Sequence, residues 1–140
     1  MDNKVIDILN KERSCALSIS LSDNTPHTSC MVFAYKKDPL EIYFLTDKDS
    51  KKMEPLLNGL PAKASFVLGF DEKNMITLQT DGEIRMEEDR GKIEEIRKIY
   101  FEKYPDHKRY ENEGSCYLVF TPIWWRYTDF NPVPNLIISS

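Results

Sequence analysis

Residues 42–52, which read IYFLTDKDSKK, are the most informative stretch of the sequence. The stretch begins with the apolar run 42–45, whose aromatic and β-branched side chains favour a β-strand. The strand is expected to end at Thr46, and after a charged turn a short helix should follow over residues 50–58. Pro55 cannot donate the N–H that the second turn of a helix requires, so we expect the helix to kink or break just before it.

The same stretch brings together groups that bind anions. Thr46 and Ser50 carry hydroxyls, Lys51 and Lys52 carry ammonium groups, and the N-terminus of the expected helix presents free backbone N–H groups. Hydroxyls and N–H groups take phosphate oxygens, and lysines supply the opposite charge. The stretch therefore predicts a phosphate-binding corner; an ordinary helix cap followed by solvated lysines is the alternative.

The rest of the sequence predicts a mainly β protein. Short apolar or alternating runs are separated by turn residues such as SDNTP at 22–26, a pattern typical of antiparallel strands. The Asp-Gly pair at 81–82 marks a bend or bulge. Because turns join most of the strands and no GxGxxG motif occurs, a small antiparallel β-barrel is favoured over a parallel sheet. The expected strands cover residues 15–21, 27–35, 41–46, 64–70, 75–80 with a continuation over 83–86, 115–120 and 123–130.

Two further helices are expected at the periphery of the barrel. Asp2 or Asn3 can cap the first, whose apolar residues share one side. The second covers residues 90–104, where apolar residues recur with helical spacing until Pro105 stops the helix. Residues 106–114 should then form a polar loop.

Length and composition bound the classes of function. The chain has 140 residues, so we expect one domain over residues 1–140. Its net charge of −4 argues against a general nucleic-acid binder, and no apolar run approaches the roughly 20 residues that a membrane span needs. The N-terminus is too charged for a signal peptide. Cys15, Cys30 and Cys116 are odd in number and lack CxxC spacing, which indicates small, buried hydrophobic side chains in a reduced cytoplasm; the alternative is that one of them lines a ligand pocket.

Three other groups could line a ligand site. Gln79, on the expected strand 75–80, either points into the barrel and needs hydrogen-bond partners there, or faces water. The run 124–127, WWRY, sets aromatic rings beside an arginine, which suits ring stacking as well as core or dimer packing. His27 could border a ligand, and His107 falls in the expected loop. Neither histidine has a partner at metal-binding spacing, so no metal site is predicted.

Taken together, these segments resemble the pyridoxamine 5'-phosphate oxidase-like family of FMN-binding split barrels. The resemblance runs over roughly residues 2–130. Its most specific part is the strand that ends in aromatic-x-Thr, followed by Ser-Lys-Lys at 50–52 and, at matching distance, by the strand TLQTDGEIR at 77–85. The order and spacing of these elements carry the resemblance, because no single motif decides it.

The resemblance implies FMN in a cleft between the two subunits of a homodimer. Lys51 and Lys52 match the basic phosphate-binding residues of the family, with Thr46 and Ser50 beside them. The other positions that the resemblance assigns to the flavin are the backbone of Ser29, Cys30, Met31, Val32, Leu45 and Thr46, the side chain of Gln79, and Trp125 and Arg126, which would reach the partner's flavin.

Two departures from the family pattern limit what the resemblance implies. The oxidase proper often has an arginine near the start of its flavin-binding strand, and that place falls at or near Cys30 in this sequence. The oxidase also has a longer C-terminal part whose arginine and histidine hold pyridoxal phosphate, whereas residues 131–140 read NPVPNLIISS. We therefore do not expect genuine pyridoxamine 5'-phosphate oxidase activity.

Three functions remain open at this point. The first is an FMN-dependent oxidoreductase with an unknown substrate and electron donor, in which the flavin does the redox chemistry and no side chain is required as a general base. The second is a module that carries or senses flavin without turnover. The third is a split barrel that binds haem, with His27 as a possible ligand, or a deazaflavin in place of FMN.

Overall fold

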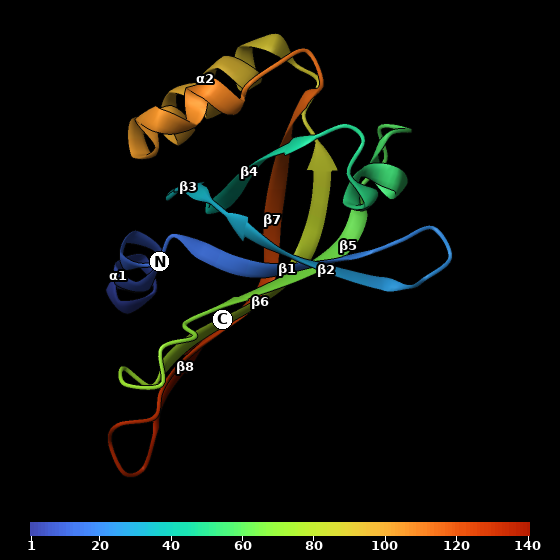
Figure 1. Cartoon of the computed structure of the whole chain (residues 1–140). Coiled ribbons are helices and arrows are strands. Elements are labelled where there is room, and N and C mark those ends of the chain that lie inside the picture. The colour runs from blue at the N-terminus through green and yellow to red at the C-terminus, as the bar shows by residue number, and fades with distance from the viewer.

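The strands of the computed structural model, which covers residues 1–140, form one antiparallel sheet that curls round on itself (Figure 1). Along the sheet the strands follow the order β2-β1-β5-β6-β7-β4-β3, and β8 pairs with β7. This arrangement confirms the predicted antiparallel barrel with peripheral helices. The strands are β1 (Ser14–Ser20), β2 (Pro26–Val32), β3 (Ala34–Lys36), β4 (Glu41–Asp47), β5 (Ala62–Leu68), β6 (Ile76–Met86), β7 (Ser115–Asp129) and β8 (Leu136–Ser139).

The barrel is closed by the chain itself at Phe33. The two outermost strands of the order, β2 and β3, are consecutive in sequence and separated only by this residue. The prediction of one strand over residues 27–35 was therefore wrong, because β2 pairs with β1 whereas β3 pairs with β4. Side-chain alternation alone could not show that the strand changes partner. We call this junction the seam. Since β2 and β3 do not pair with each other, the barrel is split along this line.

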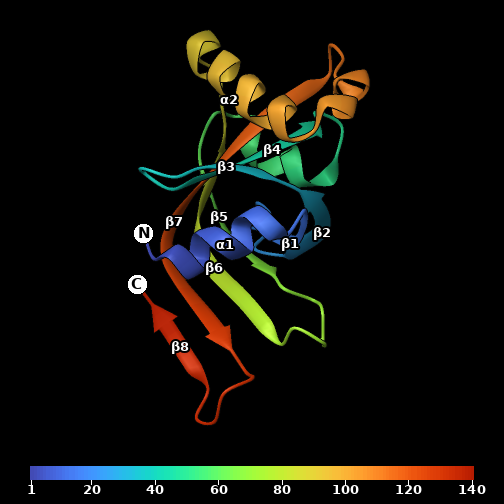
Figure 2. The same ribbon diagram turned by 90° about the vertical axis from the view of Figure 1, so that its left-hand side faces the viewer.

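The C-terminal third of the chain also differs from the prediction. The two strands expected over 115–120 and 123–130 form one strand, β7, which runs through Pro122. Opposite this proline the register shifts between Asp81 and Gly82, which confirms the predicted bulge. The beginning of β6, the end of β7 and β8 form a ribbon that projects from the barrel, at the end away from α2 (Figures 1 and 2).

The hydrophobic core fills the inside of the barrel. Every second side chain of a strand points inward, so β1 buries Cys15, Leu17 and Ile19 and turns the residues between them outward. Two phenylalanines from neighbouring parts of the wall, Phe66 and Phe120, meet edge to face with ring centres 5.0 Å apart. The barrel interior is therefore packed with side chains, and any ligand site must lie at its surface or ends.

The helices lie where the sequence predicted them, with one addition. α1 (Asn3–Lys11) is capped by Asp2, whose carboxylate accepts a hydrogen bond from the backbone of the first turn. α2 (Arg90–Lys103) crosses one end of the barrel, as Figures 1 and 2 show. The expected loop over 106–114 instead starts with a short 3-10 helix, η2 (Pro105–Tyr110). None of the helices is long and apolar enough to span a membrane.

The predicted helix over residues 50–58 is shorter and tighter than expected. It is the 3-10 helix η1 (Lys51–Leu56), which contains Pro55 without breaking before it. Hydrogen bonds in a 3-10 helix span three residues, so such helices are usually short. This segment consequently lacks the α-helical N-terminus that was expected to face a phosphate.

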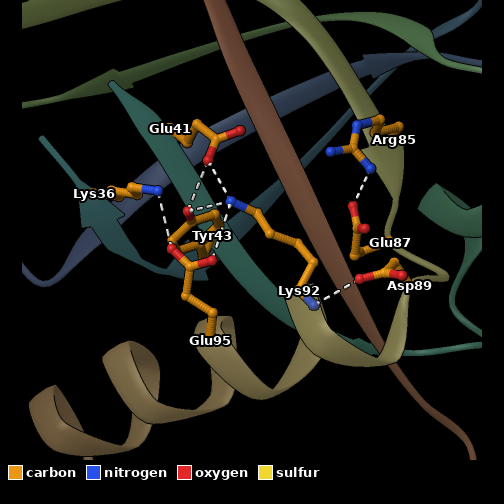
Figure 3. Close-up of polar contacts among 8 residues, drawn as sticks. All are labelled: Lys36, Glu41, Tyr43, Arg85, Glu87, Asp89, Lys92 and Glu95. Atoms are coloured by element: carbon orange, nitrogen blue, oxygen red, sulfur yellow. Dashed lines mark hydrogen bonds and ion pairs between the residues drawn. The ribbon is translucent and has the colours of Figure 1, made fainter. Parts of the chain in front are cut away.

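A cluster of charged and aromatic side chains ties α2 to the sheet (Figure 3). The Lys92 ammonium lies 2.8 Å from a Glu41 carboxylate oxygen and 3.3 Å from the Tyr43 hydroxyl, which also donates to Glu41 over 2.8 Å. Glu95, one turn further along α2, pairs with Lys36 of β3 at 2.9 Å. Because Glu41 and Lys92 are mostly buried, this cluster holds α2 in a fixed place over β3 and β4.

Side chains at the C-terminal end of α2 form hydrogen bonds with the backbone of the seam. The Tyr104 hydroxyl donates to the Phe33 carbonyl over 2.6 Å, and the Lys103 ammonium donates to the same oxygen over 3.1 Å. Lys103 Nζ also lies 4.4 Å from the centre of the Phe33 ring. Its positive charge therefore contacts the ring face while its N–H group donates to the carbonyl. No carboxylate pairs with this ammonium. Arg13, whose guanidinium stacks 4.9 Å from the centre of the Tyr104 ring, adds a second positive charge nearby.

Lys103 is expected to make the stability of the fold rise with pH. Burial, with the nearby Arg13 charge, lowers its pKa from 10.5 to about 8. Above pH 8 the folded protein releases this proton while the unfolded chain keeps it until about pH 10.5, so unfolding takes up a proton and stability increases across that window. Chemical denaturation at several pH values should therefore show wild type gaining stability relative to Lys103→Met between pH 8 and about 10.

The comparison with Lys103→Met separates the pH dependence due to Lys103 from that of other titrating groups. Burial raises the pKa of Tyr104 to about 12 and that of Cys15 to about 12, so both destabilise the folded state at high pH. The contribution of Cys15 is present in both proteins and cancels in the difference. Tyr104 shares the Phe33 carbonyl with Lys103, so the comparison is cleanest below about pH 9, where the tyrosine hydroxyl is protonated in the folded and the unfolded protein. A difference in unfolding free energy that stays constant from pH 7 to 10 would show that Lys103 keeps its ordinary pKa.

Candidate functional site

The structure brings together three of the four predicted phosphate-binding side chains. Lys52 donates to the Thr46 hydroxyl over 3.2 Å and to the Ser50 hydroxyl over 3.3 Å, and the two hydroxyls lie 3.2 Å from each other. Thr46 comes from the end of β4 and Ser50 from the residue before η1, so the short turn between them closes the group. We call these three residues the corner. Lys51 is exposed and takes no part in these hydrogen bonds.

The corner has an unbalanced positive charge. Lys52 is only 8% exposed, yet its partners are the two neutral hydroxyls, and it takes part in none of the ion pairs of the chain. Burial lowers the pKa of its ammonium below the ordinary lysine value. A buried charge of this kind costs free energy unless an opposite charge and further hydrogen bonds accompany it. The corner is therefore suited to an anion that would supply both.

Ser50 lies in the predicted corner but does not cap the helix that follows. It stands at the N-cap position of η1, but its side chain makes no capping hydrogen bond and instead faces Thr46 and Lys52. Because η1 is a six-residue 3-10 helix, its dipole contributes little at this position. The polar groups gathered at the corner therefore come from side chains more than from the helix end.

The predicted flavin-binding run on β2 alternates between the two faces of the sheet. Cys30 is exposed on the outer face beside Ala16, whereas Ser29 and Met31 pair with Leu17 and Cys15, which are buried. The Ser29 hydroxyl is buried and has no hydrogen-bond partner in the chain. A buried hydroxyl without a partner is rare in folded proteins and suggests that a ligand completes it. β2 packs beside η1, which places this run near the corner.

A cavity of about 330 Å³ opens beside Thr46. Val32 and Leu45, two more of the predicted flavin-binding positions, line it on the side of the sheet. The opposite wall comes from α2 and η2, with Tyr100 and His107 among its residues. The structure therefore collects the corner and the ends of β2 and β4 into one region at the α2 end of the barrel (Figure 1).

The wall formed by η2 was missed at the level of sequence, where His107 was placed in a loop. The available signal was the three-residue spacing of Tyr104, His107 and Tyr110. In a 3-10 helix residues three apart lie one above another. The structure follows this rule, since the His107 ring stacks on Tyr104 with centres 4.9 Å apart and meets Tyr110 at 5.6 Å.

Two of the remaining predicted residues, Gln79 and Arg126, lie on the outer face of the sheet, away from that cavity. Gln79 points outward and is exposed, which answers the question that the sequence left open. It stands opposite Arg126 on β7, and the Arg126 guanidinium lies 5.4 Å from the centre of the Trp124 ring. Gln79 lines a separate shallow cavity of about 320 Å³ over β1, β2, β5 and β6.

The predicted pairing of Trp125 with Arg126 needs correction. Trp125 is opposite Thr80 and packs against the hydrophobic core, so it points to the other face of β7 from Arg126. Adjacent residues of a strand point to opposite sides, and Trp124 is therefore the tryptophan that shares a face with Arg126. Thr80 itself carries a buried hydroxyl without a hydrogen-bond partner.

The fold is a split barrel, and Thr46, Ser50 and Lys52 form a hydrogen-bonded corner at its surface. A sequence model of the family described as "Pyridoxamine 5'-phosphate oxidase like" matches residues 1–111, and the chain belongs to this family. No curated protein sequence matches the chain.

Several solved structures share the fold. A conserved hypothetical protein from Mycobacterium tuberculosis is 19% identical and superimposes with a TM-score of 0.76, over 96% of this chain and 88% of that one. A protein related to general stress protein 26 of B. subtilis (pyridoxinephosphate oxidase family), from Clostridium acetobutylicum, is 17% identical, with a TM-score of 0.69 over 99% and 96% of the two chains. The haem storage protein HutZ from Vibrio cholerae is 12% identical, with a TM-score of 0.71 over 86% and 89%. At these identities the likeness concerns the fold alone.

Proposed function

We propose that this protein binds FMN at the corner and acts as a flavin-dependent oxidoreductase in the form of a homodimer. The observation that carries the proposal is Lys52, a buried ammonium that is held by two hydroxyls and has no carboxylate partner. A phosphate group supplies the missing negative charge and can accept hydrogen bonds from all three side chains of the corner. FMN carries such a group, and family membership favours a flavin.

The residues around the corner fit the rest of a flavin. The backbone of Ser29, on β2 beside η1, would border the polar chain of the cofactor. Val32 and Leu45 provide an apolar border beside Thr46, which suits the side of a planar ring. These groups would bind and orient the cofactor and keep water from part of it. Bound FMN supplies the redox chemistry, so none of these side chains has to act as a nucleophile or base.

The homodimer follows from the division of the predicted residues into two groups. One group surrounds the corner, and the other, with Gln79, Arg126 and Trp124, lies on the outer face of the sheet. A second copy that packs on this outer face would bring its residues towards the first copy's corner and complete the flavin site. This arrangement also gives a use to the flat, polar outer surface of β1 and β5.

The first experiment is a visible absorption spectrum of the purified protein before and after addition of FMN, with the excess removed. Stoichiometric flavin bands that survive gel filtration, together with the mass of a dimer by light scattering, are the expected results. Turnover with reduced nicotinamide and an electron acceptor would then separate an oxidoreductase from a module that only carries flavin. A colourless protein would contradict the proposal, and titration with haemin and with a deazaflavin would identify which of these the barrel binds instead.

A further inference from the structure

The cavity beside the corner has a wall of aromatic rings. Tyr100, His107 and Tyr110 line it, and His107 is fixed by its stack on Tyr104, at 4.9 Å and an angle of 14° between the rings. The Tyr100 hydroxyl lies 3.5 Å from His107 Nδ1, which leaves Nε2 of that ring for a ligand. Aromatic walls of this kind favour flat rings that can stack on them or meet their edges.

The charges of the lining select among flat rings. Asp47 is the one acidic residue that lines the cavity, and neither a lysine nor an arginine does so. The carboxylate of Asp47 is held in place, because it accepts a hydrogen bond from the Asp49 backbone over 2.8 Å. A carboxylate combined with the faces of tyrosine rings attracts a cation and repels an anion. The Lys52 ammonium, which lies behind Thr46, would be neutralised by a bound phosphate.

We propose that this cavity takes a second ligand of the flavin site, a planar aromatic ring that is uncharged or positively charged. The inference rests on the proposed function, since the ring would approach a flavin anchored at the corner. The volume of about 330 Å³ lies near the lower end of the roughly 300–1,000 Å³ typical of ligand pockets, which suits one small ring system. A ring that carries a phosphate or carboxylate, as vitamin B6 phosphates do, is disfavoured by repulsion from Asp47, which is itself exposed to solvent.

Three probes with the same ring and different charge test this selectivity: 1-methylnicotinamide, which is a cation, nicotinamide, which is neutral, and nicotinate, which is an anion. Their dissociation constants should be measured by calorimetry on FMN-loaded and on FMN-free protein. We expect the cation to bind about tenfold more tightly than the anion. Asp47→Asn should reduce that ratio to about one, because the side chain keeps its shape and loses its charge.

Asp49→Asn is the matched control. It removes one negative charge from the same turn, but Asp49 is exposed and does not line the cavity, so the ratio should stay as in wild type. An equal loss of selectivity in both variants would show that the total negative charge of the turn, and not the position of Asp47 in the cavity, determines the ratio of the dissociation constants. That result would overturn the inference.

The outcomes distinguish this inference from the proposed function. If FMN is retained and the three probes bind alike or compete with FMN, the cavity is not a second-ligand pocket and only the proposed function stands. If FMN is not retained but the FMN-free protein still prefers the cation through Asp47, the proposed function is wrong and the selectivity of the cavity stands.

Discussion

Replacement of Lys52 by methionine is expected to weaken FMN binding and to stabilise the FMN-free protein at the same time. The ammonium of Lys52 would make charge-assisted hydrogen bonds to the phosphate, so its loss should cost roughly 1.5–3 kcal/mol of binding, or about 10- to 150-fold in affinity. Without FMN the same ammonium is a buried charge with only two hydroxyl partners. Methionine has a similar length and no charge, so unfolding free energy should rise by about 1–2 kcal/mol.

The neighbouring lysine provides the control for this experiment. Lys51 is exposed, so Lys51→Met should leave the unfolding free energy within about 0.5 kcal/mol of wild type. Its effect on FMN affinity should also be the smaller of the two. Fluorescence titration with FMN and urea denaturation measure both quantities. If Lys52→Met destabilised the FMN-free protein, the corner would be a structural contact and not a site kept ready for an anion.

Replacement of Phe33 by alanine is expected to cost about 3–5 kcal/mol of folding stability. Phe33 is 0% exposed, stacks on Phe66 with ring centres 6.5 Å apart, and joins the two strands that close the barrel. The variant would leave a cavity at the seam and would remove the ring over which Lys103 places its charge. Urea denaturation with near-ultraviolet circular dichroism should show an earlier midpoint and a weaker aromatic signal.

Phe70→Ala is the control, because it removes a phenylalanine ring that is exposed and far from the seam in sequence. Phe70 lies in the turn between β5 and β6 and is 59% exposed, so its removal should cost less than about 0.5 kcal/mol. A loss of stability in Phe33→Ala no greater than that of the control would mean that the seam does not depend on the buried ring.

Most of the architecture could be predicted from the sequence, because alternation and turn residues are local signals. The bulge at residues 81–82 and the end of α2 before Pro105 follow from single residues whose backbone chemistry is distinctive. The seam could not be predicted, since residues on both sides of Phe33 favour a strand and only the three-dimensional pairing shows that the strand changes partner.

The candidate site could be predicted only in part, for a similar reason. Thr46, Ser50 and Lys52 are close in sequence, so a local pattern placed them together correctly. The pattern did not show that Lys51 would stay outside this hydrogen-bonded group, because adjacent side chains at the start of a short helix do not face each other. Tyr100 and His107 come from a distant part of the chain, and their position depends on how α2 crosses the sheet.

Because only the chain itself joins β2 to β3 at the seam, local opening of the barrel should be easiest there. The outer edges of β2 and β3 have no strand partner at the seam, so their backbone amides should exchange with solvent faster than those of β6 and β7, which lie between partners on both sides. The contacts that hold the seam include the hydrogen bonds from Lys103 and Tyr104 to the Phe33 carbonyl and the packing of the buried Phe33 ring against Phe66, but no strand ladder. Since Val32 is the residue just before the seam, such motion would enlarge the cavity that it lines.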